Sequence, residues 1–174
     1  MRLADARRDH YRRLAKDQGY RSRAAYKLKQ INDSYRILKR GNRVVDIGCA
    51  PGGWVQVATK EAGPGGRVVG IDLKEVEPVD GATILQGSID DPAAVAKIVE
   101  ALGEEKADII LSDLAPNVSG MWEVDHARQI DLTRSALALA RQVLKAGGNA
   151  VFKVFEGEFL NELKNEMKAS FGKV

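Results

Sequence analysis

The stretch that most constrains the fold is residues 44–54, Val-Val-Asp-Ile-Gly-Cys-Ala-Pro-Gly-Gly-Trp. A β-branched run leads into an acid, and a Gly/Pro-rich turn then opens a helical pattern. Such a strand–turn–helix unit lets a ligand approach backbone N–H groups closely. The dinucleotide fingerprint G-x-G-x-x-G is absent, because the next glycine after Gly48 is Gly52. The turn therefore favours an adenosine-type ligand other than NAD over an ordinary βα turn.

Short β-branched runs alternate with amphipathic helical patterns along the rest of the chain. The predicted strands cover residues 43–47, 67–72, 82–86, 107–113 and 149–155, and the predicted helices about 23–33, 55–61, 92–102, 126–145 and 159–167. Ser22 is expected to cap the first of these helices, and Gly147 and Gly148 to end the long one. This alternation is typical of an α/β fold with a mostly parallel sheet and helices on both faces.

The composition limits the class of protein. With 174 residues, of which 44% are hydrophobic and 29% charged, the chain suits one globular domain. No apolar run approaches the roughly 20 residues of a membrane span, and no signal-peptide pattern opens the chain. Cys49 is the only cysteine, and His10 and His126 fit no metal-ligand spacing. We therefore expect a cytoplasmic monomer without disulfide or metal.

Positive charge is concentrated near the N-terminus. Residues 1–43 contain fourteen Lys and Arg against four Asp and Glu, whereas the remainder contains thirteen against twenty. Residues 1–20 are predicted to form a basic arm, either a loose helix or a segment that is disordered until it binds RNA. Its cations are Arg7, Arg8, Arg12, Arg13 and Lys16, and tyrosines lie among and after them at Tyr11, Tyr20, Tyr26 and Tyr35. This pattern favours a nucleic-acid partner over a merely solvated helix face.

Three of the predicted strands end in an acid: Asp46, Asp72 and Asp113. In such sheets, ligands bind beyond the carboxyl ends of the strands, where the strand order reverses. The acids and the glycine turn are therefore expected to converge on one site. A carboxylate at Asp72, at the end of the neighbouring strand, is predicted to accept hydrogen bonds from both hydroxyls of a ribose. Segment 86–90, which includes Ser88, is expected to meet the adenine edge.

Lys153 interrupts an apolar strand that is expected to be buried on both faces. A buried lysine is rare unless it is paired. Asp113, at the end of the predicted neighbouring strand, is the expected partner, and a purely structural ion pair is the alternative. Lys27, on the helix before the sheet, is expected to supply a second cation near the same point.

Four motifs follow one another at characteristic spacing. They are Asp46-x-Gly48-x-x-Pro51-Gly52-Gly53-Trp54, the segment 22–28, the segment 112–120, and Val151-Phe152-Lys153-Val154-Phe155-x-Gly157. Together they resemble the FtsJ-type RNA ribose 2′-O-methyltransferases, in the family's order, from about residue 20 to the end. The resemblance implies that residues 21–174 form a Rossmann-like methyltransferase domain that uses S-adenosylmethionine (SAM) as methyl donor and no metal.

The resemblance also implies roles for individual residues. Lys27, Asp113 and Lys153 match the first three members of the family's catalytic Lys-Asp-Lys-Glu tetrad. The implied cofactor contacts are Gly52, Trp54, Asp72 and Asp113, with Asp46 and Gly48 in the same motif, and Ser88 stands where the family often has an acid. The tetrad glutamate normally follows the last helix, and this chain stops at Val174. We therefore expect the C-terminal hairpin strands of the family's sheet to be missing and interpret the chain as incomplete.

The implied substrate is a ribose 2′-hydroxyl of RNA, with a uridine of large-subunit ribosomal RNA first and tRNA as the alternative. Lys153 is expected to act as a base if its amine is neutral, or otherwise to orient the hydroxyl and stabilise oxyanion charge. Two other hypotheses stay open. A catalytically silent RNA-binding module is compatible with the missing glutamate, and a nicotinamide-dependent dehydrogenase is opposed by the glycine spacing.

Overall fold

Five parallel strands, in the order β3-β2-β1-β4-β5, form the central sheet. This computed structural model describes the backbone of residues 3–174 and the side chains from residue 9 on. The strands are β1 (Arg43–Ile47), β2 (Arg67–Asp72), β3 (Ala82–Gln86), β4 (Ala107–Ser112) and β5 (Leu144–Phe152). Strand order reverses between β1 and β4. The predicted α/β class and parallel sheet are confirmed.

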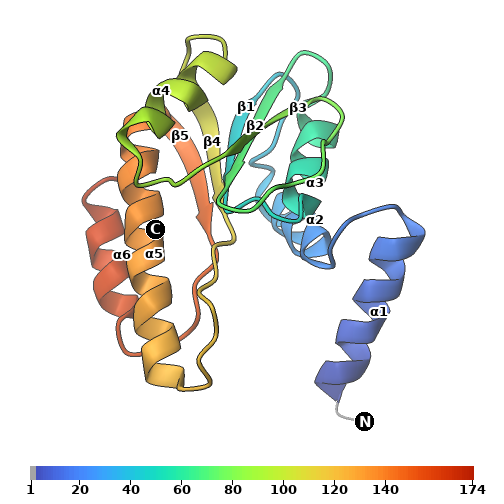
Figure 1. Cartoon of the computed structure of the whole chain (residues 1–174), viewed down its shortest axis with the longest axis vertical. Helices are drawn as coiled ribbons and strands as arrows, with labels where there is room; N and C mark the ends of the chain where they lie inside the picture. Colours follow the sequence, from blue (N-terminus) through green and yellow to red (C-terminus); the bar gives the residue numbers. More distant parts are fainter. Residues whose placement is uncertain (1–2) are drawn as a thin grey trace.

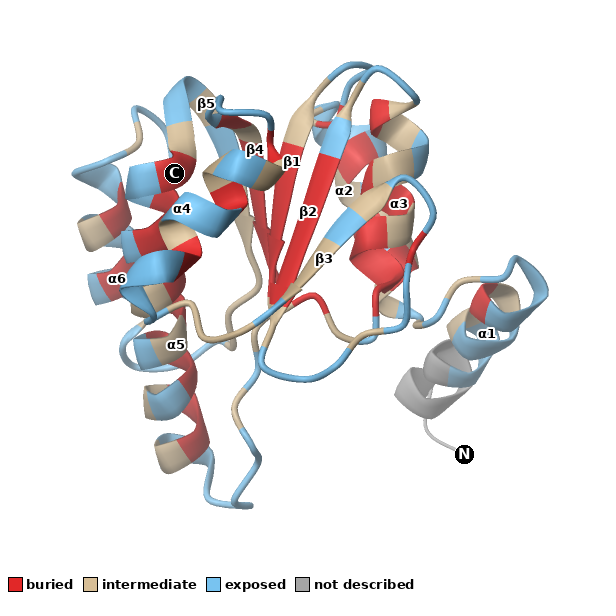
Figure 2. Ribbon diagram, turned by 45° about the horizontal axis from the view of Figure 1, so that its top comes forward, coloured by how far each residue is buried: buried red, intermediate tan, exposed pale blue. Residues whose placement is uncertain are grey.

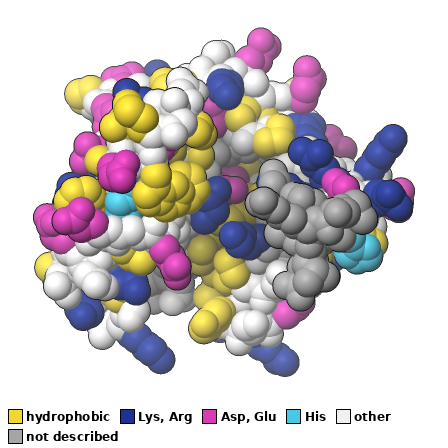
Figure 3. Space-filling model, turned by 90° about the horizontal axis from the view of Figure 1, so that it is seen from below, with side chains coloured by type: hydrophobic (Ala, Val, Ile, Leu, Met, Phe, Trp, Pro, Cys, Tyr) yellow, Lys and Arg dark blue, Asp and Glu magenta, His cyan; other side chains and the backbone are white. Residues whose placement is uncertain are grey.

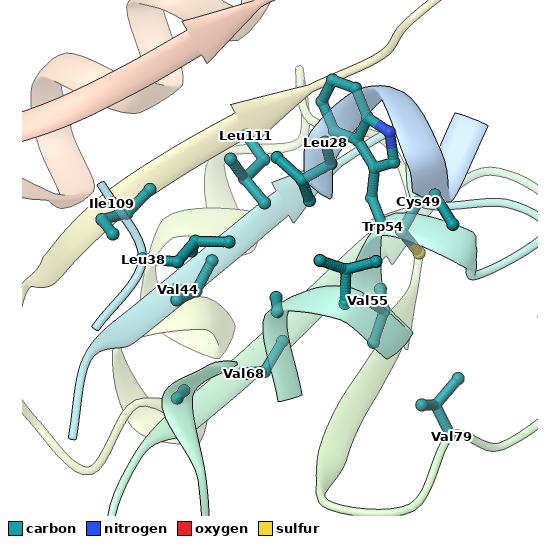
Figure 4. Close-up of a cluster of buried hydrophobic side chains, with 14 residues drawn as sticks. Leu28, Leu38, Val44, Cys49, Trp54, Val55, Val68, Val79, Ile109 and Leu111 are labelled. Atoms are coloured by element: carbon teal, nitrogen blue, oxygen red, sulfur yellow. The ribbon is translucent and has the colours of Figure 1, made fainter. Parts of the chain in front are cut away.

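Helices cover both faces of the sheet (Figures 1 and 2). One face carries α2 (Ala24–Tyr35) and α3 (Gly53–Ala62), and the other carries α4 (Pro92–Ala101) and α5 (Trp122–Val143), with α6 (Leu160–Lys168) against α5. Side chains alternate between the two faces along β1, because Val44 packs with the α2–α3 layer and Val45 with the α4–α5 layer. Figure 4 shows the first of these clusters, in which Leu28 and Trp54 pack over the sheet. Both layers therefore bury a β-branched sheet face.

The N-terminal segment is helical. Residues Leu3–Asp17 form α1, which extends away from the sheet and contacts α2 (Figure 1). The Tyr26 hydroxyl donates to the Leu14 carbonyl at 3.1 Å, and the Gln30 amide donates to the Tyr11 hydroxyl at 3.0 Å. Tyr11 and Tyr20 each lie 5.8 Å from Tyr26, measured between ring centroids. These three tyrosines therefore hold the α1–α2 junction together.

The cations of this segment are distributed along α1. Arg12, Arg13 and Lys16 are exposed, whereas the side chains of Arg7 and Arg8 lie outside the described residues. Of the four tyrosines that the sequence places among and after the charges, Tyr35 is 75% exposed. The other three tyrosines are half-buried and serve to pack α1 against α2. The exposed feature of the predicted RNA-binding segment is therefore its positive charge.

The last predicted strand and the long helix are shifted relative to the structure. The helix was predicted over 126–145 and the strand over 149–155, but α5 ends at Val143 and β5 begins at Leu144. Leu144 pairs with Ala107 and Asn149 with Ile109, so residues 145–148 bulge out of the ladder. Gly147, at φ 76°, belongs to this bulge and does not end the helix. Lys153 consequently follows β5 instead of interrupting it.

Two smaller predictions have opposite outcomes. Asp91 caps α4, as its side chain accepts a hydrogen bond from the Ala93 N–H at 2.9 Å. Ser22 does not cap α2, because the N-cap residue is Arg23 and its side chain accepts no capping hydrogen bond from the first turn. After β5 the described chain continues into α6, without a further strand pairing in residues 3–174. Among the described helices, none has the length and apolar character to cross a membrane.

Candidate active site

A cavity of about 740 Å³ lies at the carboxyl edge of the sheet, where the strand order reverses. Four of the predicted site residues line it. They lie at or just after the ends of β1, β2, β3 and β4, and are Gly48, Asp72, Ser88 and Asp113 in that order. The far wall is formed by the chain that follows Asp113 and by α5. Figure 3 views the molecule from this side and shows Lys and Arg side chains around a hollow, with hydrophobic side chains beside them.

Two glycines of the turn have a positive φ, which other residues rarely adopt. Gly48 has φ 75°, and a Cβ there would overlap the Leu114 side chain. Gly52 has φ 111°, and a Cβ there would lie 3.0 Å from the guanidinium of Arg21. Gly48 lines the cavity, whereas Gly52 is buried beside Arg21 and is not among the wall residues.

Trp54 has a packing role in the structure. Its side chain is 3% exposed, and its indole Nε1–H donates to the Ala24 carbonyl at 2.8 Å. This bond joins the start of α3 to the start of α2. The indole therefore lies in the core and does not line the cavity.

Asp72 is held in one orientation by the backbone around it. Its Oδ2 accepts from the Ala50 N–H and its Oδ1 from the Lys74 N–H, both at 2.9 Å. A carboxylate oxygen carries more than one acceptor site, so a ligand hydroxyl can share these atoms. The predicted ribose contact is compatible with this geometry.

Asp46 is a buried acid. Its side chain is 1% exposed, and neither carboxylate oxygen has a hydrogen-bond partner among the residues whose side chains are described. Burial, followed by the negative charges of Asp113 and Asp72, raises the pKa of Asp46 well above its usual range. The charges of Asp72 and Asp113, which line the cavity, therefore act on the buried carboxyl group of Asp46. Within the described residues, no group of three or more His, Cys, Asp or Glu side chains is arranged to hold a metal ion.

Asp113 and Lys153 form an ion pair, as the sequence predicts. Their side chains are 20% and 29% exposed, so the pair lies at the surface of the site and not in a fully buried strand. The expectation of burial on both faces is wrong, because the residues of β5 are half-buried or exposed and Lys153 follows the end of that strand at Phe152. The Lys153 N–H still donates to the Ser112 carbonyl at 2.9 Å. Because Ser112 directly precedes Asp113, this bond keeps Asp113 and Lys153 adjacent.

Lys27 is the third matched member of the predicted tetrad. It is exposed on α2, and among the residues whose side chains are described it has no ion-pair partner. The structure thus joins Asp113 and Lys153 in an ion pair beside the cavity, whereas no ion pair of Lys27 on α2 is found among the described side chains.

Two polar residues of α5 were not predicted and organise the loop that follows β4. The carboxylate of Asp125 accepts from the Ser119 N–H and hydroxyl, both at 2.8 Å, and from the Gly120 N–H at 3.2 Å. These hydrogen bonds lower the pKa of Asp125. The side-chain amide of Gln129 forms hydrogen bonds with the backbone that follows β4 and with the backbone that follows β5. The sequence feature that could have identified them is the spacing of Asp125, Gln129 and Thr133. These polar residues are four apart and lie on the inner face of the helix.

The sequence profile of the FtsJ-like methyltransferase family matches residues 20–174. Proteins named "Ribosomal RNA large subunit methyltransferase E" are similar over nearly the whole chain. The one from Methanothrix thermoacetophila is 51% identical over 172 residues, covering 99% of this chain and 66% of that protein. The one from Nitrosopumilus maritimus is 51% identical over 174 residues, covering 100% of this chain and 88% of that protein.

A solved structure is also similar. A Plasmodium falciparum protein, provisionally named a ribosomal RNA methyltransferase, superposes with a TM-score of 0.81 at 35% identity, covering 88% of each chain. The present chain is shorter than several of its relatives: it spans 66% of the Methanothrix protein and 61% of the one from Methanosarcina acetivorans.

Proposed function

This chain belongs to the FtsJ-like methyltransferase family, and from that premise we propose that it methylates a ribose 2′-hydroxyl of RNA with SAM as donor. The observation that carries the proposal is the Asp113–Lys153 ion pair at the rim of a cavity at the switch point of the sheet. The relatives named for large-subunit ribosomal RNA support that RNA over tRNA as the substrate. The nucleotide that we assign in it is a uridine.

The cavity fits a cationic adenosine-type ligand. Its volume of about 740 Å³ is in the range of sites for ligands of this size. Asp72 and Asp113 line it with carboxyl groups, and the buried carboxyl group of Asp46 lies close enough to both for their charges to raise its pKa. Gly48, Asp72 and Ser88 are the residues we assign to holding SAM. When bound, SAM supplies a methyl group on a sulfonium, which is already an activated electrophile.

Lys153 is the residue we assign to the acceptor hydroxyl. An alcohol is a weak nucleophile at neutral pH, so a group that takes or shares its proton accelerates attack. Nζ of Lys153 receives that proton if the amine is neutral, and otherwise orients the hydroxyl and stabilises oxyanion charge. Asp113 fixes the position of Nζ through the ion pair. Lys27 contributes a second positive charge from α2.

The RNA partner is supported by the charge of the chain. The exposed cations Arg12, Arg13 and Lys16 follow one another along α1, on a segment that is basic while the rest of the chain is acidic. Phosphate contacts of this kind position an RNA without reading its sequence. The choice of nucleotide is therefore assigned to contacts near Lys153 and not to α1.

The proposal is tested by labelled methyl transfer from SAM to total RNA and to isolated ribosomal particles. A methyl group on the 2′-oxygen removes the nucleophile of alkaline cleavage, so the labelled linkage should resist alkali, and its position can be mapped. Label in large-subunit RNA at an alkali-resistant linkage is the expected result. Label on a base, or in tRNA alone, would contradict the ribose or the ribosomal part of the proposal respectively.

A further inference from the structure

The strands that carry the reactive pair stop pairing just before it. β4 ends at Ser112 and β5 at Phe152, and the last backbone bond between the two segments is Lys153 N–H to Ser112 O at 2.9 Å. Asp113 and Lys153 therefore lie at the point where the ladder ends. Beyond it, backbone pairing no longer fixes the separation of the two segments.

Beyond the end of the ladder, the side chain of Gln129 bridges the two segments. It is 0% exposed and comes from α5, which packs over the ends of both strands. Its Nε2 donates to the Leu114 carbonyl at 3.2 Å and, at 3.5 Å, to the Lys153 carbonyl. Its Oε1 accepts from the Phe155 N–H at 2.6 Å. One amide thus bonds to the residue after Asp113, to Lys153 itself and to a residue two positions further.

A glutamine suits this position for a chemical reason. Its primary amide offers a donor and an acceptor on the same planar group, as a peptide unit of a neighbouring strand does. It can therefore replace a ladder unit between two segments that have separated. A buried amide is costly unless it is hydrogen-bonded, and here both of its ends have partners. The bonds hold the segments and do not point into the cavity, since Gln129 is not among its wall residues.

We propose that Gln129 is a positioning residue for methyl transfer, which bridges the segments after β4 and β5 and so keeps Lys153 in register with Asp113. This inference rests on the proposed function, because the reaction it assists is the one assigned to Lys153. It adds a residue outside the matched motifs. Gln129 acts through the backbone and touches neither the donor nor the acceptor hydroxyl.

The test uses Gln129→Met, which keeps the length and approximate volume of the side chain and removes its donor and acceptor. We expect kcat for RNA methylation to fall by about tenfold or more, because small misplacement of a reacting group is costly. The dissociation constant of SAM, measured by calorimetry, should stay within about twofold of the wild-type value. If Gln129 had a purely structural role, the substitution would change both kcat and the dissociation constant of SAM, or neither of them.

Thr133→Val is the matched control. Thr133 is 2% exposed, lies one turn further along α5, and donates only to the Gln129 main-chain carbonyl among the described bonds. It should leave kcat within about twofold. Normal kcat in folded Gln129→Met, or an equal fall in Thr133→Val, would overturn the inference. Absence of methylation by the wild-type protein would instead count against the proposed function.

Hydrogen exchange of the wild-type protein gives a result that needs no variant. The Phe155 N–H should exchange more slowly than the neighbouring N–H groups of Val154 and Glu156, for which no hydrogen bond is found among the described residues. Exchange of Phe155 at the rate of those neighbours would overturn the bridge itself. This measurement stays informative if Gln129→Met does not fold, and it does not depend on methylation.

Discussion

Lys153 and Lys145 form ion pairs with Asp113 and Asp108, at opposite ends of the same two strands. They therefore make a matched pair for testing the proposed chemistry. Lys153→Ala should lower kcat for methyl transfer by about 10²–10⁴-fold, the usual contribution of a positioned proton acceptor. SAM affinity should change little. Lys145→Ala should leave methyl transfer unchanged, and activity of Lys153→Ala near that of Lys145→Ala would remove Lys153 from the reaction.

Asp46 makes a prediction about stability and pH. Its pKa is raised in the folded protein by burial and by two neighbouring acids, so the native state binds a proton more tightly than the unfolded chain. Its contribution is therefore favourable at low pH and is lost as pH rises through the raised pKa. Asp46→Asn cannot ionise and should be more stable than wild type at pH 7. The melting temperature should rise by a few degrees, since about 1 kcal/mol shifts it by about 2–4 °C in a domain of this size.

Thermal unfolding between pH 5 and pH 8 measures this difference. The curve for Asp46→Asn should fall less steeply with pH than the wild-type curve. Asp33→Asn, at an exposed position of α2, is the control and should follow wild type. Parallel curves for wild type and Asp46→Asn would show that Asp46 is not strained by ionisation in the fold.

At the scale of elements, the strand–turn–helix units were predicted well and the end of the chain less well. Strands β1, β2 and β3 have the predicted bounds because each is a short β-branched run with a turn signal on either side. The α5–β5 boundary was displaced by a bulge. A Gly-Gly pair is compatible with a helix end or with a bulge, and the pairing of Leu144 with Ala107 decided between them.

Helix α1 is the element assigned to RNA. Replacing Arg12 and Arg13 by Ala should weaken RNA binding and reduce the slope of log affinity against log salt by about one to two, because each phosphate contact contributes a slope of about 0.7–0.9. Fluorescence anisotropy with a labelled RNA fragment at several salt concentrations measures both quantities. The control replaces Lys97 and Lys106, exposed cations of α4 and of the turn before β4. An equal slope in both double variants would leave α1 without a role in binding.

At the scale of the whole molecule, ligand binding should stabilise the domain by mass action. At a SAM concentration of 100 times its dissociation constant the gain is about 2.7 kcal/mol, or roughly 5–10 °C in melting temperature. NAD should give no shift, since the glycine spacing is not that of a dinucleotide site. Asp72→Ala should lower the shift at fixed SAM concentration. A shift with NAD and none with SAM would return the chain to the dehydrogenase hypothesis.

The sequence by itself determined the order of the elements, the parallel sheet, and the placement of Asp72 and Asp113 at one edge. These follow from local pattern, because a strand that ends in an acid presents that acid at the carboxyl edge in any parallel sheet. The same reasoning predicted the Asp113–Lys153 pair. It also predicted the basic N-terminal segment, as either a loose helix or a disordered arm, and the structure shows the helix α1 in contact with α2.

Only the tertiary structure decided which of the motif residues face the cavity. Gly48 lines it, whereas Gly52 lies against Arg21 and the indole of Trp54 lies in the core. Gln129 likewise has no motif around it, and its function depends on two carbonyls and one N–H from segments distant in sequence. Spacing along the chain fixes which edge of the sheet a residue reaches. Packing of α2 and α5 against the sheet fixes which way its side chain points.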